Sequence, residues 1–202
     1  MIGAVAFAAP ATALEPAPRI CRVPTWSGRR INLADPDPAD IDPFDIAEHL
    51  SKLCRRQGTV QKFYSEAQHA VIVARACPPE WQAWALLYGA NAYLLGRQLA
   101  VLRMLLEDLG VPPAMSVLEQ RVDTAIHARF GLAYPPPEAC RAAVTAAAHR
   151  AASTEARDLM PAHRGNHGPA LPRRIIPLAP APAAELWLDE CRRLFPGIHV
   201  RL

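Results

Sequence analysis

The sequence predicts an all-α fold, an irregular helical bundle formed by a single domain. Apolar residues recur at helical spacing in several segments between residues 43 and 195, and proline- and glycine-rich connections separate these segments. No alternating apolar and polar pattern indicates a strand ladder, and no internal repeat is visible. A chain of 202 residues, of which 51% are hydrophobic, is long enough for one domain with a well-filled core.

The first part of the chain differs in composition from the rest. Residues 1–20 are rich in Ala and Pro and low in complexity, so we expect a disordered tail ahead of a helical domain over residues 21–202. Ala11-Thr12-Ala13 resembles a signal-peptidase site, but no positive segment precedes it and Pro10 interrupts the apolar run, which favours an extension over an export signal. Gly28 supplies turn chemistry for a short turn or β-like arm over residues 26–33.

Two helix starts can be located from capping residues. Asp42 followed by Pro43 predicts an N-cap and first turn, and apolar residues at helical spacing continue to residue 53. Ser65 is the expected cap of the next helix. Residues 67–74 of that helix are apolar nearly all round, which predicts a central, buried position.

The second half of the chain predicts further helices. A long helical stretch is expected over residues 80–109, with Gly89 and Gly96 marking a break or bend. Ser116 and Glu119 have the spacing of a capping box, which predicts the start of the following helix. The remaining helices are expected over residues 116–130, 138–159 and 182–195.

Charge and cysteine usage exclude some classes of protein. The formal net charge of +3 favours neither a nucleic-acid binder nor a membrane-surface binder, and no run of apolar residues approaches the length of a membrane span. The five cysteines lie far apart and lack metal-binding or redox spacing. An odd number of scattered cysteines argues against a disulfide scaffold and favours a reducing compartment, so we expect a cytoplasmic protein.

Several stretches together resemble one family, and Phe63-Tyr64-Ser65-Glu66-Ala67-Gln68-His69-Ala70 is the most specific of them. The others are residues 25–30, 45–47, 50–51, 53–56, 85–87, 92–94, 154–160 and 175–178. Over roughly residues 22–197 the chain resembles the HD-domain phosphohydrolase superfamily, in its bacterial and phage branch related to 5′-deoxynucleotidases. The resemblance implies an HD-type helical fold.

The resemblance also implies a metal site, in which a first His, an adjacent His-Asp pair and a last Asp hold a divalent ion that activates water. His69 matches the first ligand. Tyr88-Gly89 stands where the His-Asp pair belongs, Asn91 lies where an acid is expected, and the last Asp falls at Ala148. His69 is therefore the only matching ligand, and one histidine does not form a metal cage. We expect no metal cofactor.

A vestigial pocket is the expected remnant of that site, formed by Gln68, His69, Tyr88, Gly89 and Asn91. We expect the ring of Tyr88 to fill the vacated metal position and its hydroxyl to bond His69, although His69 can equally be a satisfied core histidine.

Charged side chains near the predicted pocket have two interpretations. Arg55 and Arg56 are candidate phosphate-binding residues because the family uses an arginine near there, with plain surface charge as the alternative. Glu155, Arg157 and Asp158 are expected to form ion pairs on a helix surface.

Three functional hypotheses follow from the residues and the resemblance. The leading one is a catalytically degenerate HD-domain homologue that binds a nucleotide-like ligand or a protein partner. The first alternative is a metal-dependent nucleotide phosphohydrolase using Mn, Co or Zn, with ligands relocated to residues such as His149 or Asp158. The second is a structural or assembly subunit, because residues 94–106 carry an excess of leucine that predicts a homo-oligomer or protein complex through this helix.

Overall fold

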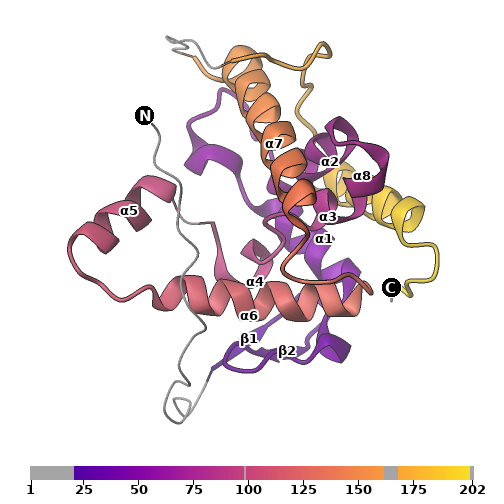
Figure 1. The fold of residues 1–202 in the computed structure, drawn as a ribbon. Helices are drawn as coiled ribbons and strands as arrows, with labels where there is room; N and C mark the ends of the chain where they lie inside the picture. The colour runs from indigo at the N-terminus through magenta and orange to yellow at the C-terminus, as the bar shows by residue number, and fades with distance from the viewer. Residues whose placement is uncertain (1–20, 98, 162–167, 201–202) are drawn as a thin grey trace.

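A computed structural model of the chain describes residues 21–97, 99–161 and 168–200, and these residues form a mostly helical fold (Figure 1). The α-helices are α1 (Pro43–Lys52), α2 (Glu66–Ala76), α3 (Gln82–Leu87), α4 (Ala92–Leu95), α5 (Ala100–Asp108), α6 (Ala114–Arg129), α7 (Glu138–Leu159) and α8 (Pro180–Leu194). The prediction of an all-α fold is confirmed. The predicted tail over residues 1–20 lies outside the described residues.

A small hairpin precedes the helices and confirms the predicted β-like arm. Strands β1 (Arg22–Pro24) and β2 (Arg30–Asn32) pair antiparallel, with Val23 opposite Ile31. The Ser27 backbone N–H and hydroxyl each donate to the Asp45 carboxylate at 2.7 Å. The turn of the hairpin is thereby attached to α1.

Both predicted helix caps are present. The Asp42 side chain accepts a hydrogen bond from the Phe44 N–H at 3.0 Å, and the Ser65 hydroxyl accepts one from the Gln68 N–H at 3.2 Å. Helix α2 lies at the centre of the fold, as its apolar composition predicted, because it packs against α1, α3, α7 and α8. Its residues Ala67 and Val73 are completely buried.

The predicted helical stretch over residues 80–109 is divided into α3, α4 and α5, and the breaks lie around Gly89 and Gly96, as expected. Gly96, with φ +69°, is the C-cap of α4, and Gly89, with φ +77°, lies two residues after the end of α3 in the turn that leads to α4. The predicted capping box at Ser116 is wrong. Helix α6 begins two residues earlier at Ala114, directly after Pro113, and no side chain caps it.

Helices α5 and α6 have different relations to the core. Figure 1 shows α6 passing across the body of the fold while α5 stands away from the other helices. In the part of the chain that the structure describes, no helix has both the length and the apolar character needed to cross a membrane.

Candidate functional site

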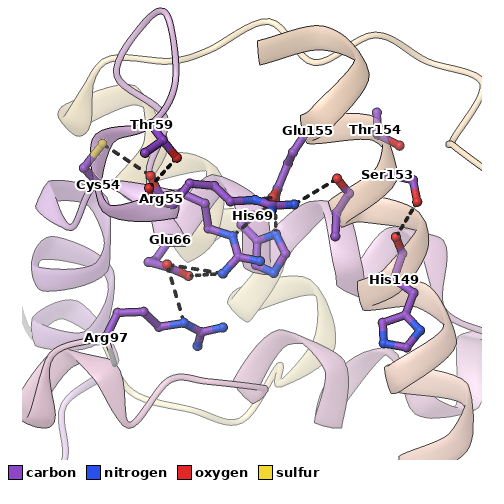
Figure 2. A network of polar contacts seen from close by, with 12 residues as sticks. Cys54, Arg55, Thr59, Glu66, His69, Arg97, His149, Ser153, Thr154 and Glu155 are labelled. Atoms are coloured by element: carbon purple, nitrogen blue, oxygen red, sulfur yellow. Dashed lines mark hydrogen bonds and ion pairs between the residues drawn. The ribbon is translucent and has the colours of Figure 1, made fainter. Parts of the chain in front are cut away.

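The first candidate region is a buried group of charges around Glu155, which lies on α7 and is completely buried. Arg55 Nε donates to Glu155 Oε1 at 3.2 Å, and Arg56 Nε donates to Glu155 Oε2 at 2.9 Å. His69 Nδ1 lies 2.6 Å from Glu155 Oε1. Figure 2 shows this carboxylate reaching from α7 toward His69 and Arg55. We refer to Glu155 and these three partners as the Glu155 cluster.

The partners decide the protonation of the cluster. Burial opposes ionisation of Glu155, but His69 and the two arginines overcome this and bring its pKa down to about 2. Burial and the charge of Arg55 lower the pKa of His69, although Glu155 acts in the opposite direction. We therefore expect an ionised Glu155 that is hydrogen-bonded to His69.

This arrangement changes two expectations from the sequence. The prediction that Glu155 forms a surface ion pair is wrong, because Glu155 is completely buried and pairs with residues about 100 positions away. Arg157 and Asp158 do form the expected ion pair, at 2.7 Å. The guanidinium groups of Arg55 and Arg56 are directed at carboxylates, and Arg56 also donates to the Ala152 carbonyl at 3.0 Å.

The prediction that the Tyr88 ring fills the position of the lost metal is wrong. The side chain of Tyr88 is 47% exposed, and His69 is bonded to Glu155 instead. The group that lies against Gly89 is the guanidinium of Arg97, whose Nη1 would be 2.6 Å from a Cβ added to that glycine. Arg97 Nε lies 3.7 Å from Glu66 (Figure 2). The positively charged guanidinium of Arg97 therefore lies beside Gly89.

The second candidate region is a cavity of about 650 Å³ enclosed by α3, α5, α6, the start of α7 and the links between them. Of the five predicted pocket residues, Tyr88, Gly89 and Asn91 line it. His69 belongs to the Glu155 cluster. The side-chain amide of Gln68 is hydrogen-bonded to the backbone of the segment before α8. It donates to the Ile176 carbonyl at 2.8 Å and accepts from the Leu178 N–H at 3.0 Å.

Asp123 on α6 is the principal acid of this cavity. Asn91 Nδ2 donates to Asp123 Oδ2 at 3.0 Å, and the Tyr134 hydroxyl donates to the same oxygen at 3.3 Å. Asp123 Oδ1 is buried and has no hydrogen-bond partner among the described residues. Burial raises the pKa of Asp123 to about 7, since the two hydrogen bonds compensate only partly and Glu119 adds a like charge.

Three arginines also line the cavity: Arg97, Arg103 and Arg141. Arg103 forms an ion pair with Glu119 at 2.6 Å, while its buried Nε finds no hydrogen-bond partner in the described part of the chain. Trp84 and Tyr134 add aromatic surface. The cavity therefore combines guanidinium groups, aromatic rings and a carboxyl group that changes protonation near neutral pH.

The residues present do not fit the metal site that the resemblance implies. Within residues 21–97, 99–161 and 168–200, no three or more His, Cys, Asp or Glu side chains are placed to hold a metal ion. The proposed replacement ligands have other neighbours. Asp158 binds Arg157 and the Ile175 N–H, and the described polar contact of His149 is its backbone carbonyl, which accepts from Ser153.

Comparisons with known proteins identify the family. No protein-family model matches the chain. The chain is 34% identical over 142 residues to an uncharacterized protein of Rhodobacter capsulatus, an alignment covering 66% of this chain and 70% of that protein. It is 30% identical over 175 residues to the uncharacterized protein YfdR of Escherichia coli, covering 83% of this chain and 92% of YfdR. The chain belongs to the YfdR family. The names of these two relatives state no activity.

Sequence reasoning missed Asp123, Tyr134, Arg97 and Arg103. A signal for Asp123 was present, because Asp123 and His127 are one helical turn apart and each follows a residue of the buried stripe, Val122 and Ile126. An acid and a histidine beside the apolar face of a helix indicate a polar site at the edge of the core.

Proposed function

We propose that this chain is a non-catalytic relative of the HD-domain phosphohydrolases that binds a nucleotide-like ligand in the cavity between α3, α5, α6 and α7. The observation that carries the proposal is the composition of the cavity wall, where three arginines and a partly satisfied carboxyl group face one space of about 650 Å³. Cavities that hold small ligands usually have volumes of about 300–1,000 Å³.

Each part of a nucleotide has a matching group in the cavity. Arginine binds phosphate through parallel N–H donors, so Arg97, Arg103 and Arg141 suit the phosphate. The rings of Trp84 and Tyr134 suit stacking on a base. Asp123 with a pKa of about 7 can donate or accept a hydrogen bond, which suits the edge of a base that carries both an N–H and a carbonyl.

The absence of catalysis is inferred from the groups that face the cavity at the degenerate positions. Gly89 contributes no side chain, and the adjacent cation is the guanidinium of Arg97, which cannot lower the pKa of a water as a metal ion does. His69 is bonded to an ionised carboxylate outside the cavity. A bound phosphate ester would therefore be held by cations without an activated nucleophile.

Calorimetric titration of the full chain with nucleoside mono-, di- and triphosphates in EDTA tests binding. We expect at least one of these compounds to bind with a micromolar dissociation constant, and R141A to weaken its affinity at least tenfold. R192A is the matched control, because Arg192 forms an exposed ion pair on α8 and should bind normally. Failure of the whole panel to bind would contradict the proposal.

Phosphate release with Mn, Co or Zn present separates this proposal from the phosphohydrolase alternative. We expect no turnover of any compound that binds. Metal-dependent turnover that is lost in H69A would instead favour an active enzyme with relocated ligands.

A further inference from the structure

Helix α5 turns its apolar face toward solvent. The large apolar residues of this helix and its two ends are between 37% and 69% exposed: Leu99, Val101, Leu102, Met104, Leu105, Leu106, Leu109 and Val111. We call these eight residues the α5 patch. A helix that packs on its own domain normally buries such residues. Most of the other large apolar side chains of the described chain do so.

The polar side of α5 faces the protein. At about 100° per residue, Leu105 marks the centre of the apolar face, and Arg103 and Glu107 lie on the opposite side. Both of these polar residues line the cavity, and Arg103 pairs with Glu119 of α6. The Arg103–Glu119 ion pair connects the polar side of α5 to α6, while the large apolar side chains of α5 stay exposed in the described chain.

The size of the α5 patch matches one side of a protein interface. Its exposed fractions leave on the order of 800 Å² of surface in water, which is about the area that each partner buries in a standard interface. The largest apolar patch on a typical monomer covers about 300–600 Å². A short helix is also marginal in water unless packing stabilises it, so covering this face would stabilise α5 itself.

The order of residues in the patch is nearly symmetrical about Leu105. Leu99 and Val111 are equally distant from it along the chain, as are Val101 and Leu109, and Met104 and Leu106. If two copies of the helix cross antiparallel at Leu105, each of these residues lies opposite an apolar residue of the other copy. Leu102, which falls opposite Asp108, is the exception. A two-fold interface requires this kind of self-complementary surface.

We infer that the α5 patch is a homodimer interface, in which α5 of two copies pack antiparallel with Leu105 at the two-fold axis. The inference does not rest on the proposed ligand: Arg103 and Glu107 face the cavity from the opposite side of the helix, and Met104 is the one residue of the patch that also lines the cavity. The dimer would support α5 as one wall of the cavity in each copy.

Sedimentation equilibrium of the full chain at micromolar concentrations tests the interface. We expect a dimer, and we expect L105E to be a monomer because two carboxylates would meet at the axis. I176E is the matched control: Ile176 is 76% exposed but lies outside the α5 patch, so this variant should remain dimeric. A monomeric unsubstituted chain, or an L105E variant that stays dimeric, would overturn the inference.

Cysteine cross-linking tests the antiparallel register without depending on a destabilising change. L105C should form a disulfide with itself, because residues at a two-fold axis come within the distance of about 4.4–6.8 Å between Cα atoms that a disulfide needs. V101C should cross-link with L109C in a mixture of the two variants and not with itself. Cross-linking of L105C no faster than that of I176C, with the unsubstituted chain as the background for the native cysteines, would refute the register.

Discussion

Two buried carboxyl groups in this protein, those of Glu155 and Asp123, have opposite protonation behaviour. Glu155 receives hydrogen bonds from two arginines and a histidine, and its pKa is lowered to about 2. Asp123 accepts hydrogen bonds from two neutral donors, both on the same oxygen, and burial raises its pKa to about 7. The comparison teaches that the charge of the partners, and not burial as such, decides whether a buried acid is ionised.

The two carboxyl groups also differ in how completely the protein satisfies their hydrogen bonds. Both oxygens of Glu155 are engaged by the protein, so this carboxylate connects α7 to the segment before α2 and to α2 itself. One oxygen of Asp123 lacks a partner in the described residues, and the acid lies on a cavity. An incompletely satisfied polar group is costly to a folded protein, and it is commonly retained where a ligand completes its bonds.

Replacing Glu155 should have the largest effect. E155Q removes the charge that compensates two arginines, and breaking a buried ion pair on one side costs roughly 3–5 kcal/mol of unfolding free energy. Urea unfolding followed by circular dichroism measures this loss. D189N removes the acid of the exposed pair with Arg192 and should cost less than about 1 kcal/mol. Equal effects of the two changes would show that the Glu155 cluster does not stabilise the fold.

Replacing Asp123 should change the pH dependence of stability. A folded-state pKa of about 7, above the usual 3.8, means that the folded state binds more protons between these values. The contribution is fully present below pH 3.8 and is lost as pH rises through 7, so the free energy of unfolding should fall by roughly 1–3 kcal/mol between pH 5 and pH 8.

D123N cannot ionise and should not show this fall. Urea unfolding of both proteins across the pH range gives the difference. A parallel pH dependence in the two proteins would mean that Asp123 is ionised throughout, and the contrast with Glu155 would then disappear.

The parts of the fold that depend on local sequence could be predicted. The caps at Asp42 and Ser65 act through hydrogen bonds within three residues, and Gly89 and Gly96 mark the breaks before and after α4 through their own positive φ angles. The burial of Glu155 could not be predicted, because it depends on Arg55 and Arg56, which follow a helix about 100 residues earlier. In sequence, Glu155 resembles any surface acid beside an arginine.

Only part of the candidate site could be predicted, because some of its contacts also depend on how distant parts of the chain meet. Tyr88, Gly89 and Asn91 were placed in a pocket by the resemblance, and they line the cavity. The resemblance did not indicate that Arg97 lies over Gly89, since this contact depends on the path of the chain between α4 and α5. The excess of leucine over residues 94–106 indicated an apolar segment, but composition does not show whether its side chains meet the core or the solvent.

Arg97 connects the two regions, because it lies against Gly89 of the cavity wall and close to Glu66, which also pairs with Arg55. G89A should destabilise the protein in two ways. A left-handed backbone costs an L-residue about 1–2 kcal/mol, and the added Cβ would displace the Arg97 guanidinium, with a further loss of about 0.5–1 kcal/mol from its ion pair. Thermal or urea unfolding measures the sum.

G131A is the control that isolates the smaller effect. Gly131 has φ +71°, close to that of Gly89, but a Cβ there would have no atom within 4 Å, so only the backbone cost applies. In an R97A background the two glycine substitutions should cost the same, because no guanidinium remains to be displaced. A difference between G89A and G131A that persists without Arg97 would mean that a group other than the Arg97 guanidinium occupies the space beside Gly89.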